Sequence, residues 1–292
     1  MVVWWLMLVY AMFGAAWLIS RRRKVRYWIP AACSVLALCA VLTVNAVQLQ
    51  RTSTVTALDV SQGQSIVFSS GRACAVVDCG GRSTAEDPGD LAARKLLAQG
   101  HRSLDLLVLT HPHDDHVNGV LRLMHWLPVR TLVIPAAADT TQAPLSDILA
   151  LAEANHTAVV RVDAERTVTA GGISVHLYPE PCAGQEDGSM IVLTSIGDYD
   201  TLVPGDVDTT AEVKFLSNCT YPGIELLLVG HHGSKKSTCD AWLDAIAPDA
   251  AIISVGYNSY GHPTSETLER LQAHNIPIYR TDQMGDITVH LS

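Results

Sequence analysis

The first fifty residues of this 292-residue chain contain no aspartate or glutamate. Residues 1–19 and 28–47 are almost wholly apolar, and each stretch is long enough to cross the hydrocarbon core of a membrane as a helix. A cleaved signal peptide has a single apolar stretch followed by a small-residue cleavage site, so the paired stretches argue against one. The sequence therefore predicts a transmembrane helical hairpin over residues 1–51.

Five basic residues separate the two apolar stretches: Arg21, Arg22, Arg23, Lys24 and Arg26. Short basic loops of membrane proteins stay in the cytoplasm. Both ends of the hairpin, and everything that follows it, are therefore predicted to lie on the outer side of the cytoplasmic membrane. This arrangement would make the chain a multi-pass membrane protein.

The remainder, residues 52–292, is poor in basic residues. It holds 14 of the 20 lysines and arginines and all 29 acidic residues, so its formal charge is 14 minus 29, or −15. Proteins that attract nucleic acid electrostatically usually present a basic face. A polyanionic substrate would have to be held by bound metal ions and a local basic patch. Lys235 and Lys236 are candidates for that patch, although a solvated loop is the plainer interpretation of them.

The chain contains no CxxC pair, which argues against a zinc knuckle built from thiolates. Five of its seven cysteines lie in residues 52–292, at positions 74, 79, 182, 219 and 239. A location outside the cytoplasm permits disulfides, but an odd number leaves the pairing undetermined. Cys79 directly follows Asp78 at an expected strand end, where it is either core filler or a neighbour of a site.

Residues 52–292 contain no repeat or low-complexity segment, and short apolar runs alternate with amphipathic ones. Strands are expected at 54–60, 64–70, 74–79, 104–110, 131–135, 158–162, 172–178, 190–196, 200–205, 224–230, 250–256, 277–280 and 286–291. Helices are expected at 88–99, 117–127, 144–155, 208–217, 237–246 and 263–274, with Asp208 and Ser237 as N-caps. This order indicates one domain over residues 52–292, with two sheets packed face to face and helices outside.

The most informative segment is LDLLVLTHPHDDHVNG, residues 104–119. An apolar run with the length of a buried strand ends in His111, His113, Asp115 and His116. Imidazole and carboxylate together suit zinc, manganese or iron. Four such groups within six residues cannot all reach one ion. If His111 and His113 point one way and Asp115 and His116 the other, the cluster predicts two adjacent metal positions.

Three further apolar runs also end in polar clusters. TLVPGD ends at Asp206, IELLLVGHHGS contains His231 and His232, and AAIISVGYNSYGHP contains Asn258, Tyr260 and His262. Sheets hold the loops at strand ends rigid, so these groups can converge on one edge. A carboxylate such as Asp206 can then bridge two ions, because each of its oxygens can bind one.

Each cluster also has a plainer interpretation. Asp206 can be a helix N-cap or a turn acid, His231 and His232 can form a polar loop, and His262 can cap the next helix. Asp59 and Asp78 each end an early strand, where they either orient metal-bound histidines or only form turns. The other histidines are expected to be ordinary surface or core residues: His101, His125, His156, His176, His274 and His290.

HPHDDH is similar to the HxHxDH signature of the metallo-β-lactamase fold. The wider set resembles the C-terminal domain of ComEC-type DNA-uptake proteins of competent bacteria over roughly residues 54–290. It consists, in order, of LDVSQGQS, VVDCGG, LTHPHDDHVNG, LVPGD, VGHHGS, SVGYNSYGHP and YRTDQMGDI. The resemblance implies an α/β (α+β) fold, an αββα sandwich with two divalent metal ions, Zn²⁺ or Mn²⁺, at the sheet edge. It also implies a role in importing single-stranded DNA, with this domain degrading the strand that is not taken in.

Carried over residue by residue, the resemblance assigns the metal ligands as His111, His113, Asp115, His116, Asp206, His231 and His262. Asp115, His232 and His262 are the expected catalytic residues. Bound ions would activate a water for attack on phosphorus, Asp115 would orient it, and a histidine would protonate the leaving oxygen. Which of His231, His232 and His262 is a ligand and which faces the substrate stays open at this point.

This chain departs from the family pattern in three places. The stretch before the bridging acid, EDGSMIVLTS, offers Asp187 and Ser189 where many relatives have a histidine ligand. Gln64 stands at an early position that is usually an acid, so any orienting role there is neutral. Only two spanning helices are expected, so the chain resembles the end of a longer protein or the product of a split or degenerate gene, and a separate channel chain is one candidate partner. The expected partners are single-stranded DNA, the membrane and other DNA-uptake proteins.

Two alternatives to a nuclease stay open. Because a fold alone does not determine the substrate, the same site could serve an esterase, a lactonase or a β-lactam-cleaving enzyme. The domain could also be a non-catalytic module of an uptake complex, which the missing histidine and the short membrane region favour. Metal analysis that finds an empty site in folded protein would favour the second alternative.

Overall fold

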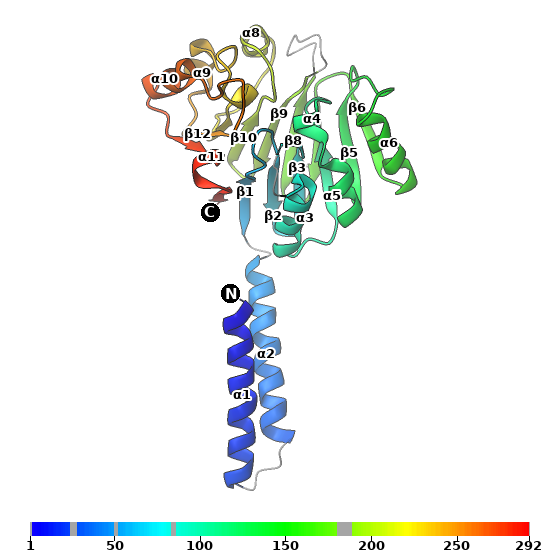
Figure 1. The fold of residues 1–292 in the computed structure, drawn as a ribbon, viewed down its shortest axis with the longest axis vertical. Coiled ribbons are helices and arrows are strands. Elements are labelled where there is room, and N and C mark those ends of the chain that lie inside the picture. The colour runs from blue at the N-terminus through cyan, green and yellow to red at the C-terminus, as the bar shows by residue number, and fades with distance from the viewer. Residues whose placement is uncertain (1, 24–27, 50–51, 83–85, 180–188, 292) are drawn as a thin grey trace. The chain divides into compact units, whose positions relative to one another are not determined.

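The computed structural model describes residues 2–23, 28–49, 52–82, 86–179 and 189–291 (Figure 1). The chain divides into two units, Met1–Arg51 and Thr52–Ser292. The division lies at the same position as the boundary that the sequence predicts. Asp187, one of the residues that stand where relatives have a histidine, lies outside the described residues.

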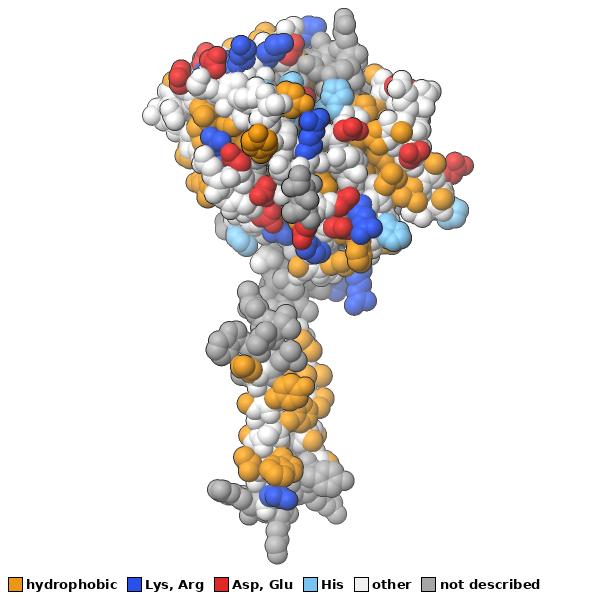
Figure 2. Space-filling model, in the orientation of Figure 1, with side chains coloured by type: hydrophobic (Ala, Val, Ile, Leu, Met, Phe, Trp, Pro, Cys, Tyr) orange, Lys and Arg blue, Asp and Glu red, His pale blue; other side chains and the backbone are white. Residues whose placement is uncertain are grey.

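The first unit is a pair of helices, α1 (Val2–Arg23) and α2 (Trp28–Leu49), that contact each other. Large apolar side chains are exposed on both, among them Trp17 and Leu36 at 57% and 68%, and they cover much of the described surface of this unit in Figure 2. Among the residues that the structure describes, no helix is both long enough and apolar enough to span a bilayer. The predicted helices are therefore present, but their predicted transmembrane character is not supported.

The second unit contains two seven-stranded sheets. The first has the order β14-β1-β2-β3-β4-β5-β6. Its strands are β1 (Ser53–Ala57), β2 (Ile66–Ser70), β3 (Ala73–Val77), β4 (Leu104–Val108), β5 (Val129–Pro135), β6 (Ala158–Val162) and β14 (Ile287–Leu291). Strands β14, β1, β2 and β3 pair antiparallel, whereas β3, β4, β5 and β6 pair parallel.

The second sheet has the order β13-β12-β11-β10-β9-β8-β7 and the same division into two halves. Strands β7, β8, β9 and β10 pair antiparallel, and β10, β11, β12 and β13 pair parallel. The bounds are β7 (Arg166–Ala170), β8 (Ile173–Tyr178), β9 (Ile191–Ile196), β10 (Tyr199–Val203), β11 (Leu226–Leu228), β12 (Ala250–Ile253) and β13 (Ile278–Arg280).

Helices cover the outer face of each sheet (Figure 1). The first sheet packs on α3 (Pro88–Ala98), α5 (Val120–Trp126) and α6 (Leu145–Ala154). The second packs on α8 (Thr209–Asn218), α9 (Asp240–Ile246) and α10 (Ser265–Ala273). The described residues of this unit also form α4 (Asp114–Val117), the 3₁₀ turn η1 (Gly230–Gly233) and α11 (Thr281–Met284). The expected αββα sandwich is confirmed.

The apolar residues of the strands explain why four layers form. All five residues of β3 are buried. Ala75 and Val77 face the second sheet, whereas Cys74 and Val76 face α3 and α5. Successive side chains of a strand point to opposite faces, so a strand that is apolar on both faces needs a cover on each side. Because both faces of such a strand are buried, its sequence is a continuous apolar run.

The parallel half of each sheet positions the polar clusters. Asp78 follows β3, His111 lies three residues beyond β4, and Asp206 lies three residues beyond β10. The η1 turn follows β11, and the segment that ends at His262 follows β12. Strands that run parallel place their carboxyl ends at one edge of a sheet, where ligand sites of open α/β sheets form. The two sheets together bring all five strand ends to one site.

No disulfide joins any two of the cysteines that the structure describes. Cys74, Cys79 and Cys219 are buried, and Cys239 is partly buried. Cys79 packs in the apolar layer under α3 and α5, and burial holds the pKa of its thiol far above the ordinary range. Of the two interpretations that the sequence allows, Cys79 is core filler.

Replacing Phe215 with alanine should lower the free energy of unfolding by about 3–5 kcal/mol. Phe215 lies on α8, is fully buried and packs against the rings of Tyr178 and Trp242, with centroid distances of 4.9 and 5.3 Å. Urea unfolding of wild type and variant measures the difference. Val213→Ala, on the same helix but 47% exposed, should change stability by no more than about 0.5 kcal/mol. Equal losses in the two variants would contradict this packing.

Candidate metal centre

The strand-end loops enclose a pocket of about 510 Å³ in the second unit. Its lining includes His113, Asp115, Asp206, His231, His232 and His262. The volume is within the range of about 300–1,000 Å³ that is usual for ligand sites. The pocket therefore combines a size suited to a small substrate with the side chains that the sequence singled out.

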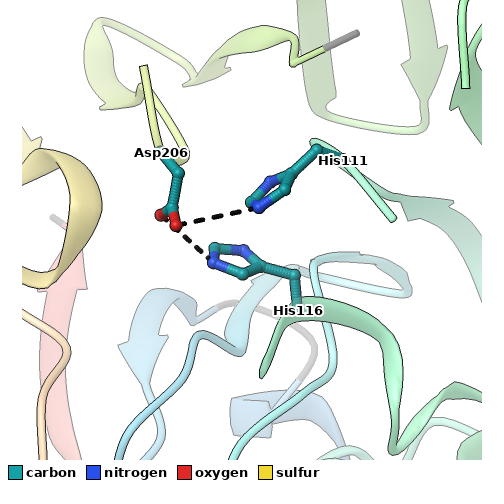
Figure 3. Close-up of side chains that lie close together, drawn as sticks. All are labelled: His111, His116 and Asp206. Carbon is teal, nitrogen blue, oxygen red and sulfur yellow. Dashed lines mark ion pairs between the residues drawn. The ribbon is translucent and has the colours of Figure 1, made fainter. Parts of the chain in front are cut away.

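Asp206 lies between imidazoles of both sheets. Its Oδ1 lies 3.2 Å from His116 Nε2 and 3.8 Å from His232 Nε2. Its Oδ2 lies 3.7 Å from His111 Nε2 and 3.6 Å from His231 Nε2. In Figure 3, His111 and His116 point toward the carboxylate from one side. Each carboxylate oxygen thus faces one pair of imidazole nitrogens, which is the arrangement that a bridging ligand needs.

Two groups of side chains in the described residues bring metal-binding atoms together: His111, His116 and Asp206 in one, and Asp115, His116 and His232 in the other. Within each group the ligand atoms lie within 4.8 Å of one another. Asp115 Oδ2 and Asp206 Oδ1 lie 3.6 and 3.8 Å from the same atom, His232 Nε2. The two carboxylates are therefore close enough to share coordination.

The fully buried carboxylate of Asp78 organises this cluster from beneath. Its Oδ1 accepts a hydrogen bond from the Thr110 backbone N–H at 2.7 Å. Its Oδ2 accepts from Gln64 Nε2 at 2.8 Å, from Thr110 Oγ1 at 2.7 Å and from His116 Nδ1 at 2.7 Å. Gln64, which stands at the usual acid position, thus orients Asp78 as a neutral donor.

Hydrogen bonds set the orientation of three imidazoles. His116 donates from Nδ1 to Asp78, and His232 donates from Nδ1 to the carbonyl oxygen of Ser254 at 2.9 Å. Thr110 uses its hydroxyl proton toward Asp78, so its oxygen accepts from His111 Nδ1 at 3.0 Å. In each neutral ring the lone pair is then on Nε2, the atom that faces the carboxylates.

The unpaired atoms test whether a metal fits. His111 Nε2, His116 Nε2, His232 Nε2 and Asp206 Oδ1 are buried and have no hydrogen-bond partner among the described residues. Buried polar atoms are nearly always paired, so an unpaired set indicates a missing ligand. Two ligands of one tetrahedral zinc lie roughly 3.3–3.6 Å apart, given its bond lengths. The separations of 3.2–3.8 Å around Asp206 agree with that value, and the residues fit a divalent cation.

Charges in the cluster favour a cation. Burial lowers the pKa of His116, but the carboxylates of Asp206 and Asp78 outweigh it and hold that pKa well above the ordinary value. Burial and the neighbouring His116 hold the pKa of His111 well below it, so His111 is neutral. Burial raises the pKa of Asp206, yet the nearby imidazoles hold it well below its usual range. Asp78 and Asp206 therefore hold a positive charge on His116 at neutral pH, and a bound cation would replace the proton on its Nε2.

Unusual backbone holds the histidine loop. His231 and His232 have φ of 50° and 53°, in the left-handed region that non-glycine residues rarely adopt. Such strain persists where surrounding contacts impose it. Here the His231 N–H donates to Gly205 O at 2.9 Å, and the Thr264 N–H donates to Gly233 O at 2.9 Å. The loop is thus tied to both neighbouring strand ends.

Glu212, a fully buried residue of α8, supports the same loop from behind. It accepts hydrogen bonds from the backbone N–H groups of Thr238 and Cys239, the latter at 2.9 Å. Arg270 donates to the carbonyl of Ser237 at 2.9 Å from the other side. Burial raises the pKa of Glu212 to about 7. No sequence pattern singled out Glu212, because its partners are backbone atoms of a distant segment.

The structure brings the predicted residues together, but the two loop histidines differ from the prediction. His111, Asp115, His116 and Asp206 belong to the two metal-binding groups, and His232 joins them, whereas the predicted ligand was His231. His113, His231 and His262 line the pocket but are outside those groups. Of the two early acids, Asp78 is the orienting one, and Asp59 is exposed. The roles of the ligands stay predictions.

The predicted basic patch does not line the pocket. Lys235 and Lys236 are exposed, and neither is among the residues that line the pocket. The cation in the lining is Arg82, which follows the VVDCGG segment. Ser189, in the stretch that lacks the histidine, is buried. Sequence reasoning missed Arg82, because an isolated arginine beside two glycines carries no pattern.

Replacing Asp78 with asparagine should weaken metal binding about 10–100-fold, because the amide N–H₂ cannot accept the hydrogen bonds that orient His116 and Thr110. Competition with a chelator, followed by metal analysis of the protein, measures the affinity. Asp59→Asn is the matched control, since Asp59 also ends an early strand but is exposed. Equal affinities for wild type and Asp78→Asn would show that the network does not orient the ligands.

Glu212 should make stability depend on pH with a defined sign. Its pKa is about 7 in the folded chain and 4.5 in its ordinary state, so the folded state keeps the proton that the unfolded state releases. The stability of wild type relative to Glu212→Gln should therefore fall as pH rises from about 4.5 to about 7, by on the order of 3 kcal/mol. Denaturant unfolding at several pH values measures this difference. The exposed control Glu153→Gln should show no such trend, and a flat Glu212 difference would refute the assignment.

Curated relatives include three proteins that are named for the ComE operon, for competence and for recombination. The chain is 29% identical to ComE operon protein 3 of Bacillus subtilis over 251 residues, which is 79% of this chain and 32% of that protein. It is 29% identical to competence protein ComA of Neisseria gonorrhoeae, over 79% of this chain and 31% of the relative. It is 26% identical to recombination protein 2 of Haemophilus influenzae, over 80% of this chain and 28% of that relative. The resemblance to ComEC-type proteins is confirmed, and the chain spans about a third of the length of these relatives.

Solved structures share the fold at low sequence identity. YhfI of Bacillus subtilis, a metallo-beta-lactamase fold protein, aligns with a TM-score of 0.55 at 13% identity, covering 82% of this chain and all of YhfI. Zn(2+)-bound PqqB of Methylobacterium extorquens aligns with a TM-score of 0.52 at 17% identity, over 79% and 88% of the two chains. CmlA of Streptomyces venezuelae, a diiron beta-hydroxylase, aligns with a TM-score of 0.55 at 17% identity, covering 82% of this chain and 54% of CmlA.

A family model matches residues 58–257, which include the strand ends that supply Asp78, His111, Asp206 and His232. The fold implies that a divalent metal binds at this edge, in agreement with the unpaired nitrogens found there. The chain belongs to the metallo-beta-lactamase superfamily.

Proposed function

We propose that this chain is a metal-dependent hydrolase that cleaves phosphodiester bonds of DNA. One observation carries the proposal: the two oxygens of Asp206 each face a pair of imidazole nitrogens at the floor of an open pocket. Two divalent ions, Zn²⁺ or Mn²⁺, would be held by these residues, and Asp206 would contribute to both. When bound, such ions lower the pKa of water toward neutrality and neutralise charge on phosphate.

Within this proposal, His111, His116 and His232 are metal ligands, because their unpaired Nε2 atoms face the carboxylates. His113 and His231 would complete the coordination from the rim. This assignment makes His232 a ligand, whereas the sequence suggested it as a catalytic residue, and it keeps His231 among the ligands. The buried His232 has its Nδ1 committed to Ser254, so it has no second nitrogen to offer a substrate.

Asp115 and His262 would then move and hold protons. Burial raises the pKa of Asp115, but its contact with His232 holds the pKa well below the usual range, so Asp115 is a carboxylate at neutral pH. It can ligate or orient a water, but it cannot donate a proton. His262 lines the pocket and has a buried Nδ1 without a hydrogen-bond partner among the described residues. We assign protonation of the leaving oxygen to His262, which has to take up a proton from solvent first because burial lowers the pKa of its ring.

The relatives support DNA as the substrate, because they are named for competence and recombination. Single-stranded DNA as substrate, the membrane and other DNA-uptake proteins as partners, and a channel supplied by a separate chain are parts of this proposal. A location on the outer side of the bacterial cytoplasmic membrane stays a prediction from the basic turn.

Purified full-length chain should hydrolyse an end-labelled oligonucleotide with Mn²⁺ or Zn²⁺. Asp206→Asn and His113→Ala should each lower kcat/KM at least about 100-fold, since even groups that only orient ligands contribute about 10–100-fold. Gel analysis of the cleaved oligonucleotide measures the rates.

The matched control is His125→Ala, an exposed histidine of α5 outside the pocket, which should keep wild-type activity. Equal activity in wild type and Asp206→Asn would identify contamination and refute the proposal. A folded wild type that binds no metal would favour the non-catalytic module instead.

A further inference from the structure

Tyr260 and Arg82 form the outer wall of the pocket, although they come from distant segments. Arg82 follows β3 in the first sheet, and Tyr260 lies between β12 and α10. Both line the pocket, and the guanidinium carbon of Arg82 lies 5.9 Å from the centroid of the Tyr260 ring. The tertiary fold therefore places a cation beside an aromatic face at the entrance.

The rings continue from this wall toward the metal centre. The Tyr260 and His262 rings have centroids 5.9 Å apart and planes inclined by 35°. The His262 and His231 rings have centroids 5.6 Å apart, and His231 Nε2 lies 3.6 Å from Asp206. A group bound against Tyr260 would thus be next to the residue assigned to protonate the leaving oxygen.

The loop that carries Tyr260 is held in place by its own hydrogen bonds. Asn258 Oδ1 accepts from the N–H groups of Tyr260 and His262 at 3.1 and 3.0 Å, and Asn258 Nδ2 donates to the carbonyls of Gly256 and His262 at 2.8 Å each. A Cβ on Gly256 would lie 2.4 Å from Ser61 Cα, so the loop packs directly on the segment after β1. A wall fixed before binding avoids the entropy cost of ordering it.

Among the described residues, the side chains of Tyr260 and Arg82 contact each other, and the Tyr260 ring also lies near that of His262. Tyr260 is 57% exposed. The arginines that form ion pairs in the described part of the chain are Arg94, Arg122, Arg130 and Arg280, and Arg82 is not one of them. The lining contains three carboxylates and four histidines but no lysine, so Arg82 supplies the permanent positive charge among the described lining residues.

We propose that Tyr260 stacks on a nucleobase next to the scissile bond and that Arg82 pairs with the adjoining phosphate, which selects single-stranded polynucleotide. This inference rests on the proposed function and names its substrate-binding residues. Aromatic side chains bind unpaired bases because every base has a face on which to stack, whereas a paired base inside a duplex has both faces covered. The single cation and the single ring match one nucleotide.

The test uses the full chain and two single-stranded substrates of equal length, oligothymidylate and the same backbone built from abasic tetrahydrofuran residues. Tyr260→Leu should lower kcat/KM for oligothymidylate about tenfold, the loss of one base stack, and change the rate on the abasic strand little. Tyr260→Phe should restore the wild-type preference. Arg82→Gln should lower the rate on both strands and weaken the dependence on salt.

Tyr257→Leu is the matched control, because Tyr257 belongs to the same loop and is 97% exposed but does not line the pocket. It should leave both rates unchanged. Equal losses for Tyr260→Leu on the two strands, or equal effects of the Tyr257 and Tyr260 variants, would refute the inference.

Binding of fluorescein-labelled forms of both strands, measured by anisotropy, separates this inference from the proposed function. If wild type cleaves neither strand but binds oligothymidylate about tenfold tighter than the abasic strand, and Tyr260→Leu removes that difference, the nucleotide site stands and the nuclease proposal fails. If wild type cleaves both strands and shows no base preference in binding or rate, the nuclease proposal stands and the stacking site fails.

Discussion

The metal centre depends on the buried carboxylate of Asp78. A charge without hydrogen-bond partners in the protein interior costs several kcal/mol, so the donors that satisfy it have to converge during folding. They come from two segments, Gln64 from the loop before β2, and Thr110 and His116 from the residues after β4. The same hydrogen bonds orient His116 directly and His111 through Thr110. The contacts that satisfy the buried charge therefore also direct the Nε2 atoms of both histidines at Asp206.

The packing of the two sheets brings these groups together. Asp206 follows a strand of the second sheet, and His111 and His116 follow a strand of the first, so neither sheet alone contains the site. The apolar layer between the sheets fixes their spacing and thereby the distance between these groups. Close backbone contact does the rest: a Cβ on Gly80 would lie 2.5 Å from the backbone of His116, so the loop that carries the histidines packs against the end of β3 only because position 80 is glycine.

The apolar runs and their polar ends predicted the sandwich and most of the centre, because buried strands need apolar residues on both faces and ligands need strand ends. Asp208 caps α8 as expected, but Ser237 does not cap α9: it is buried and donates to Val207 O, and Cys239 is the N-cap. Strand β7 was not predicted, since it is an edge strand of largely exposed residues without an apolar run. The sequence could not separate Asp59 from Asp78, because only tertiary packing decides which acid is buried.

The roles of His231 and His232 show a deeper limit of sequence reasoning. They are adjacent and chemically identical, and left-handed backbone at both turns one toward the buried group and leaves the other at the rim. Arg82 and Tyr260 belong to the same class, because contacts between distant loops define them. The loops at this edge can therefore change the substrate while the ligands and Asp78 stay in place. CmlA, a diiron beta-hydroxylase, shares this fold, which agrees with the general rule that one scaffold can carry different reactions.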